Sequence, residues 1–136
     1  MATMILANAN VTGTNGYAQQ ITTAAHELKS DEPERRGGTN TGPSPYELML
    51  ASLGACTAIT LRMYAERKQW SLGAMDVKLR LVKKDDAPVH IERKISVSET
   101  MEAEQLEKLL EIAGKTPVTK ALAPGVPIET VFETSG

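Results

Sequence analysis

The chemistry that this chain could perform centres on one thiol. Cys56 is the only cysteine among 136 residues, and small residues surround it, with Gly54, Ala55 and Ala58 close by in the sequence. A thiol reacts as a nucleophile only when it is ionised, so a catalytic role requires a nearby cation. A helix dipole does not supply one, because Cys56 is expected about three turns into a helix and the dipole acts mainly on the first turn. Without such a cation, Cys56 would be a small apolar side chain of the core.

Arg93 is the first candidate for that cation. It is the one charged residue among alternating apolar positions, which predicts that its guanidinium points toward the interior with Val89, Ile91, Ile95 and Val97. A guanidinium in a core is costly unless it is paired. The partner is either a glutamate, in a structural ion pair, or the thiol and its acidic neighbour. Arg35 and Arg36, in a glycine-rich loop, are rivals, although adjacent loop arginines are usually solvated.

Glu47 is the candidate acidic neighbour. The run Ser44-Pro45-Tyr46-Glu47 is typical of a capping box, with Ser44 as N-cap and proline at the first helical position, so Glu47 already has a structural role. Glu47 precedes Cys56 by nine residues, which places it about 180° around the same helix, so the two side chains do not meet without a kink. The Tyr46 ring either packs against other side chains or presents its hydroxyl to a ligand near the start of the helix.

Composition excludes several classes of function. Fifteen basic residues against seventeen acidic ones give a net charge of −2, which predicts no nucleic-acid or anionic-lipid partner. His26 and His90 read as exposed residues, and two histidines with one thiol do not make a zinc site, so no metal or cofactor is expected. The uncharged apolar stretch Leu48–Leu61 is shorter than the ~20 residues that span a bilayer, and it predicts a buried helix. We expect no signal peptide and a cytoplasmic protein.

The remaining pattern predicts the elements that position these residues. Residues 5–11 and 17–23 alternate around Asn15-Gly16, as in a hairpin, and residues 29–44 lack any period, as in an exposed loop. The other predicted elements are a helix over 45–68, strands over 75–81 and 89–97, a helix capped by Thr100 and ended by Gly114, a short helical segment over 116–122 and a final strand over 128–132. The order β-β-loop-α-β-β-α-β defines an α+β fold, and we expect one domain over residues 1–136.

The helix over 45–68 has an unusual composition. Its middle is apolar nearly all round, and small residues make it slim enough for another backbone to approach closely. At roughly 24 residues it is also longer than a domain of this size needs for one packed face. A helix with this profile is expected at the centre of an assembly.

These residues resemble a known family. The run GGTNTGPSPYELMLASLGACTAITLRMYAERKQW is similar to the central motif of the osmotically inducible protein C and organic hydroperoxide resistance (OsmC/Ohr) superfamily, whose first cysteine follows a Pro-x-Glu or Pro-Glu-x motif. The later IERKISV and KTPV segments fit the second half of the same family. The resemblance implies an intertwined α+β homodimer, with the long helices packed centrally against antiparallel sheet and a thiol site at each subunit boundary.

The resemblance also implies a chemistry, from which this sequence departs. In active members the first cysteine, here Cys56, attacks a hydroperoxide and becomes a sulfenic acid, which a second cysteine resolves. An arginine of the amino-terminal region, paired with the motif glutamate, activates the thiolate. Here Thr116 stands where the second cysteine would fall, and the first hairpin has no arginine, which leaves Arg93 or the loop arginines as substitutes. Tyr46 separates the proline from Glu47, as in a Pro-Tyr-Glu subgroup.

Two functions follow. The first is a one-cysteine thiol peroxidase of the oxidative stress response, which uses Cys56, Glu47 and Arg93 to reduce an organic hydroperoxide and takes electrons from an external thiol reductant. The second is a non-enzymatic dimeric binding module that holds a small hydrophobic ligand in an apolar cleft beside Cys56.

Overall fold

The computed structural model describes residues 3–133 and has a mixed helical and antiparallel-strand architecture. Two compact units can be distinguished, one made of residues up to Ala51 and the other of residues from Ser52 on. The long helix α1 (Pro45–Lys68) begins in the first unit and continues into the second. The expectation that the whole chain is a single domain stays a prediction.

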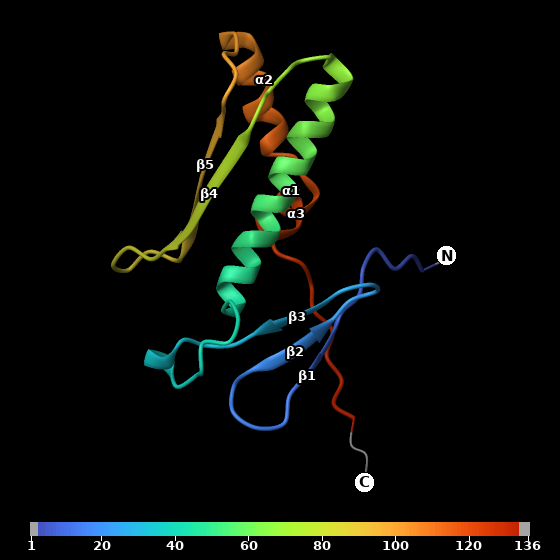
Figure 1. The fold of residues 1–136 in the computed structure, drawn as a ribbon, viewed down its shortest axis with the longest axis vertical. Helices are drawn as coiled ribbons and strands as arrows, with labels where there is room; N and C mark the ends of the chain where they lie inside the picture. The colour runs from blue at the N-terminus through green and yellow to red at the C-terminus, as the bar shows by residue number, and fades with distance from the viewer. Residues whose placement is uncertain (1–2, 134–136) are drawn as a thin grey trace. The chain divides into compact units, whose positions relative to one another are not determined.

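The first unit contains a three-stranded antiparallel sheet in the order β1-β2-β3 (Figure 1). Its strands are β1 (Asn10–Thr12), β2 (Gln19–Thr22) and β3 (Glu27–Ser30). The predicted hairpin is confirmed, with Val11 paired to Ile21. Its strands are shorter than predicted, because residues 5–9 pair with nothing among the described residues. The sequence pattern did not predict β3, which pairs with β2. The last two residues of β3 lie where the loop over 29–44 was expected to begin.

The long helix has the bounds that its sequence predicts. The backbone N–H of Ser44 donates to Glu47 Oε1 at 2.9 Å, and the backbone N–H of Glu47 donates to Ser44 Oγ at 3.2 Å, which completes the capping box. The helix ends where Gln69 adopts a left-handed φ of 61°. By length and composition alone α1 could cross a membrane, but it is also the helix that contributes Leu61 and Ala65 to the hydrophobic core.

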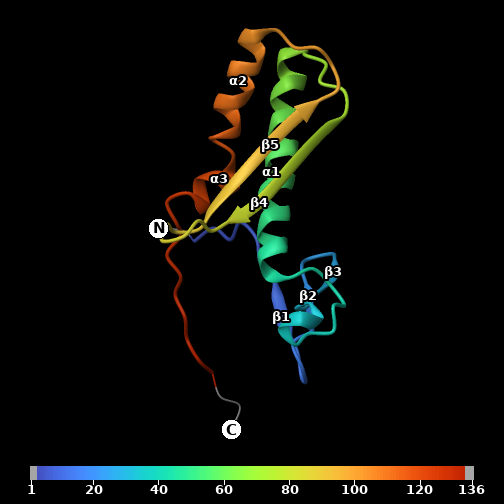
Figure 2. The same cartoon turned by 90° about the vertical axis from the view of Figure 1, so that its left-hand side faces the viewer.

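The second unit packs a hairpin and the helix α2 against α1. Strands β4 (Met75–Val82) and β5 (His90–Val97) pair antiparallel, and both the hairpin and α2 (Ala103–Ala113) lie alongside α1 (Figures 1 and 2). The last helix is α3 (Pro117–Leu122). The core residues are Leu61, Ala65, Leu72, Leu109 and Ala113. The predicted strand pair and the helical segment after Thr116 are therefore confirmed.

Two predictions about this unit are wrong. The N-cap of α2 is Glu102 rather than Thr100, because the Glu102 side chain accepts from the third helical residue while Gln105 closes a capping box from the other side. No strand forms over 128–132 in the described chain, and Ile128 and Phe132 are 87% and 92% exposed. An isolated alternating segment has no sheet edge to complete, so it stays extended and uncovered.

Candidate functional site

Cys56 lies in the twelfth position of α1 and is half-buried. Its Sγ lies 4.0 Å from Thr60 Oγ1, one helical turn later, which is a weak sulfur hydrogen bond. Its neighbours along the chain differ sharply, since Ala55 is exposed whereas Thr57 is fully buried. The thiol therefore sits at the border between the packed and the open side of the helix.

Arg93 reaches the residue next to that thiol. Its Nη1 donates to Thr57 Oγ1 at 2.9 Å and to Thr119 Oγ1 at 3.0 Å, and its Nη2 donates to the carbonyl oxygen of Ala113 at 3.0 Å. The hydroxyl of Thr57 in turn donates to the carbonyl oxygen of Leu53 at 2.7 Å. The inward orientation predicted from strand alternation is confirmed. Neither of the two partners left open for the guanidinium, a glutamate or the thiol with its acidic neighbour, bonds to it, because its hydrogen-bond partners in the described chain are neutral oxygens.

This arrangement leaves a positive charge beside Thr57 without a carboxylate against it. A guanidinium held by hydroxyl and carbonyl oxygens keeps its full charge. Cys56 is one helical step, about 100°, from Thr57 around α1. Within residues 3–133, neither Cys56 nor Glu47 is a hydrogen-bond or ion-pair partner of Arg93.

Thr116 occupies the position at which the family resemblance places a second cysteine, and it has a structural role there. It is fully buried and caps α3, with its Oγ1 accepting from the backbone N–H of Thr119 at 3.3 Å. The hydroxyls of Thr116 and Thr119 also lie 2.7 Å apart, so Thr116 belongs to the network that holds Arg93. The position at which the resemblance places a resolving cysteine is thus occupied by a helix cap and a hydrogen-bonded pair of threonines.

Glu47 lies in the first unit, exposed at the start of α1, where its Oε1 completes the capping box. Tyr46 is 61% exposed, so its ring is not packed away. Arg35 and Arg36 lie in a one-turn 3-10 helix (Glu34–Arg36) before α1, and both are exposed as predicted.

The loop that carries these arginines is anchored by Asp31, which the sequence analysis did not single out. Its carboxylate is 2% exposed and accepts from the backbone N–H and hydroxyl groups of both Thr39 and Thr41, and from the backbone N–H of Glu32. These bonds, above all that from the Thr39 hydroxyl, hold the pKa of Asp31 well below its usual range. Only the bond from Glu32 joins neighbouring residues, and those from Thr39 and Thr41 span eight and ten positions, so no local motif identifies Asp31 from the sequence.

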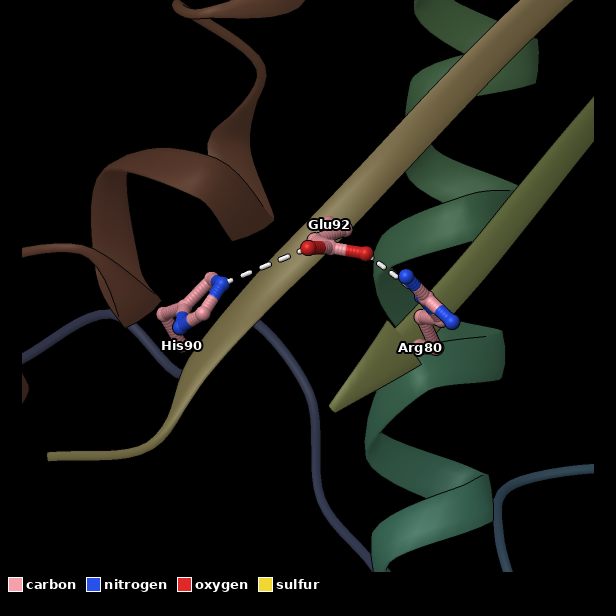
Figure 3. A network of polar contacts seen from close by, with 3 residues as sticks. All are labelled: Arg80, His90 and Glu92. Carbon is pink, nitrogen blue, oxygen red and sulfur yellow. Dashed lines mark hydrogen bonds and ion pairs between the residues drawn. The ribbon is translucent and has the colours of Figure 1, made fainter. Parts of the chain in front are cut away.

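A second polar cluster lies on the hairpin (Figure 3). Glu92 of β5 accepts from Arg80 of β4, and its other oxygen lies 3.5 Å from His90 Nε2. The bond from Arg80 is the main cause that lowers the pKa of Glu92 from its ordinary value, with His90 adding to it. All three side chains are solvent-accessible, and His90 is exposed as predicted. The cluster ties the two strands together.

Fold and site together define an α+β protein with one thiol on a long helix and a half-buried arginine bonded to the residue that follows it. The sequence model of the family described as "OsmC-like protein" matches residues 38–131. This chain belongs to that family, as the central motif predicted.

Solved structures share the fold at low sequence identity. An osmotic stress induced and detoxification response protein from Psychrobacter arcticus is 18% identical, with a TM-score of 0.76 over 91% of this chain and 92% of its own. An organic hydroperoxide resistance protein from Legionella pneumophila is 19% identical, with a TM-score of 0.66 over 90% and 92%. The organic hydroperoxide resistance protein OhrB of Bacillus subtilis is 21% identical, with a TM-score of 0.60 over 88% and 91%. No curated protein sequence matches the chain significantly.

Proposed function

We propose that this protein is a one-cysteine thiol peroxidase of the oxidative stress response, which reduces organic hydroperoxides through Cys56. The observation that carries the proposal is the Arg93 guanidinium, bonded to Thr57 at 2.9 Å beside the cysteine, with neutral oxygens as its hydrogen-bond partners in the described chain. The hydroperoxide resistance proteins that share the fold support the choice of substrate class. Glu47 enters as the acidic partner through the family resemblance alone.

The proposed first half of the cycle is attack of the Cys56 thiolate on the terminal oxygen of the hydroperoxide. The sulfur–oxygen bond forms as the oxygen–oxygen bond breaks, and the leaving alkoxide takes a proton to become an alcohol. The sulfur is oxidised to a sulfenic acid while the peroxide is reduced. Arg93 favours the thiolate at the start of this step because its positive charge stabilises the negative sulfur.

The second half requires an external thiol, because Thr116 offers no resolving sulfur and the chain has no other cysteine. One reductant molecule attacks the sulfenic sulfur and releases water, which leaves a mixed disulfide on Cys56. A second reductant thiol attacks the reductant's own sulfur in that disulfide and restores the Cys56 thiolate. One hydroperoxide and two thiols thus give one alcohol, one water and one disulfide. Such a cycle fits the cytoplasm, where thiols are kept reduced.

A homodimer is part of the proposal. Ile59 and Met63, one turn apart on α1, are 59% and 57% exposed, and only 22% of the most apolar window of this helix is buried within one chain. Apolar side chains of the carboxy-terminal segment are uncovered to the same degree or more, at Val126, Ile128, Val131 and Phe132. Leaving this much apolar surface in water is unfavourable, and a second copy would cover it. A concentration-independent monomer in sedimentation would overturn this part.

An apolar cavity supports the second candidate, a binding module for a small hydrophobic ligand, although Cys56, beside which the cleft was expected, is not one of its lining residues. About 450 Å³ in volume, it lies among side chains of α1, β4, β5, α2 and the connection before β4, chiefly Leu61, Leu72, Met75, Ile95, Leu109 and Leu110. That volume is within the range of small-molecule sites. On this alternative the protein binds an alkyl chain and Cys56 is chemically inert.

Intact mass spectrometry separates the two candidates. The protein is treated with one equivalent of cumene hydroperoxide in the presence of a sulfenic-acid trap, with Cys56→Ser as the control. A trap adduct on the wild type and none on Cys56→Ser supports the peroxidase. An unmodified wild type, combined with saturable binding of a fluorescent fatty acid, overturns the peroxidase and supports the binding module.

A further inference from the structure

A cavity just beyond the last residue of α1 has no part in the function proposed above. It has a volume of about 450 Å³, within the range of small-molecule sites, and lies where the connection from α1 to β4 meets the connection from β5 to α2. Gln69, its first lining residue, follows Cys56 by thirteen residues, which is about 20 Å along a helix. None of the residues assigned to the thiol chemistry lines it. The cavity is therefore separate from the proposed reaction site.

The lining of this cavity combines one carboxylate with an aromatic ring. Glu99 is its only charged lining residue in the described chain, and Trp70 and Met101 supply apolar surface. Within residues 3–133, no ion pair or hydrogen bond engages the Glu99 side chain. An unpaired carboxylate attracts a cation through its charge, and an aromatic ring does so through its quadrupole. The lining thus favours a positively charged ligand.

The cation nearby in the sequence is placed on another ring. Trp70 is half-buried and meets Tyr64 edge to face, with the ring centroids 5.7 Å apart. Lys68, in the last turn of α1, lies with its Nζ 5.7 Å from the centroid of the Tyr64 ring. Tyr64 therefore already carries a cation, whereas Trp70 lines the cavity beside the unpaired Glu99.

The neutral polar groups of the cavity select among cations. Ser71 and Thr100 offer hydroxyl oxygens and Gln69 offers an amide oxygen, and no hydrogen bond engages these side chains in the part of the chain that the structure describes. A primary ammonium group has three N–H donors, which Glu99 and these oxygens can accept. A divalent metal ion takes several oxygen ligands, and one carboxylate is a poor site for it. An organic ammonium fits better than either a metal ion or a quaternary ammonium, which has no N–H donor.

Backbone hydrogen bonds hold the two connections together. The N–H of Glu99 donates to the carbonyl oxygen of Leu72 at 3.2 Å, and the N–H of Ser98 donates to that of Ala74 at 2.9 Å. Leu72 is itself a core residue, 1% exposed. These bonds fix Glu99 relative to the segment that carries Trp70. A rigid support lowers the entropy cost of binding, because less order has to be imposed when the ligand arrives.

We propose that this cavity is a binding site for a small organic primary ammonium, with the charged group on Glu99 and the apolar body against Trp70 and Met101. An anion would be repelled by the carboxylate, and a neutral molecule would leave it unpaired. One positive charge with N–H donors on an apolar body matches the charge, the oxygens and the ring together.

The fluorescence of Trp70, the only tryptophan of the chain, tests the site directly. Benzylamine, which is protonated at pH 7, should change the Trp70 emission with saturation at millimolar concentration, while benzyl alcohol, of similar shape without the charge, should bind at least about tenfold more weakly. Benzyltrimethylammonium, which has the charge without N–H donors, should also bind more weakly than benzylamine. Binding of either control compound as tight as that of benzylamine, or the absence of a saturable change, overturns the proposal.

Variants separate a specific site from a general charge effect. Glu99→Gln should weaken benzylamine binding by about tenfold or more and leave the binding of benzyl alcohol unchanged. Glu107→Gln removes the same charge from an exposed position of α2 outside the cavity and should bind benzylamine as the wild type does. An equal loss in this control, or wild-type affinity in Glu99→Gln, overturns the proposal. Cys56→Ser should bind normally, so this result is independent of the peroxidase.

The contribution of the ring is measured with Trp70→Leu, followed by the amide chemical shifts of Glu99 and Met101 because the fluorophore is gone. Leucine keeps an apolar side chain without the negative face of the ring, so benzylamine should bind roughly threefold more weakly and benzyl alcohol less affected. Equal losses for the two compounds would overturn the assignment of the ammonium group to this ring.

Discussion

Arg93 of β5 bonds at 2.9 Å to the hydroxyl of Thr57, the residue that directly follows Cys56 on α1. The contact crosses from the hairpin to the long helix, and the same guanidinium holds the carbonyl oxygen of Ala113 at the end of α2. One cation thus joins three elements, and its charge lies against the residue that follows the thiol in the sequence. Its structural and chemical effects can be measured separately.

Arg93→Met should slow the alkylation of Cys56 by iodoacetamide at pH 7 by about tenfold, because the charge that favours the thiolate is gone. Arg35→Met and Arg36→Met, which remove exposed loop charges, should have smaller effects. The rate is followed by intact mass under native conditions. Equal slowing by all three variants would show that no particular arginine activates Cys56.

The same Arg93→Met variant should lower the free energy of unfolding by roughly 1–3 kcal/mol, because buried oxygen acceptors lose their donor. Urea denaturation measures this loss. Arg93→Lys should recover part of the alkylation rate but less of the stability, because an ammonium group keeps the charge without the guanidinium geometry. If Arg93→Met kept both the wild-type free energy of unfolding and the wild-type alkylation rate, Arg93 would neither stabilise the fold nor activate Cys56.

Thr116→Cys should convert the oxidised state from a sulfenic acid to an internal disulfide with Cys56. The expectation rests on the family resemblance, which places the resolving cysteine at this position. Loss of the threonine cap of α3 should cost about 1 kcal/mol of stability. Mass spectrometry after one equivalent of hydroperoxide detects the loss of two hydrogens, and Cys56→Ser with Thr116→Cys is the control. A persistent sulfenic acid in the single variant would contradict the prediction.

Gly54→Leu should destabilise the protein by roughly 1–3 kcal/mol through overpacking. A Cβ at Gly54 would already lie 2.7 Å from Leu79 Cδ1 of β4. In a Leu79→Ala background the penalty should be smaller, because the side chain it meets has been cut back, and a double-mutant cycle in urea measures the coupling. Unchanged melting of Gly54→Leu would mean that this side of α1 is open.

Glu92→Gln should reduce the loss of stability in acid. The lowered pKa of Glu92 means that its ionised form is favoured by folding, chiefly by Arg80 (Figure 3). This contribution is complete above the ordinary glutamate pKa of about 4.3 and disappears as the pH falls through the lower folded value. The stability gap between wild type and Glu92→Gln should therefore close between neutral and strongly acidic pH. Glu66→Gln, at an exposed site on α1, serves as the control, and a gap independent of pH would refute the linkage.

The elements with strong local signals could be predicted from sequence, and those that depend on partners could not. The first residue of α1 could be predicted from a capping box with proline at the first helical position. Its last residue could be predicted from the point at which the helical pattern stops. By contrast, β3 spans four residues without clear alternation, so only its pairing with β2 makes it a strand. The segment over 128–132 shows the opposite case, in which a strand pattern has no edge to join in the described chain.

The candidate site was predicted in the same uneven way. The orientation of Arg93 followed from strand alternation, because the period of two fixes which face a side chain takes. Its partners did not, since the hydroxyls of Thr57 and Thr119 and the carbonyl oxygen of Ala113 come together only in the folded chain. Neutral oxygens are also less expected as partners of an inward-facing cation than a carboxylate or a thiolate, the two alternatives that the sequence left open.

The helix cap at Thr116 has a kinetic consequence for the proposed cycle. With no sulfur at this position, a sulfenic acid on Cys56 survives until a reductant molecule collides with it, so its lifetime is inversely proportional to the concentration of free thiol. A further hydroperoxide competes for the same sulfur and would carry it to the irreversible sulfinic acid. The fraction of protein that is overoxidised would then depend on the ratio of hydroperoxide to thiol in its surroundings. An internal disulfide would remove this dependence, because it would protect the sulfur from further oxidation.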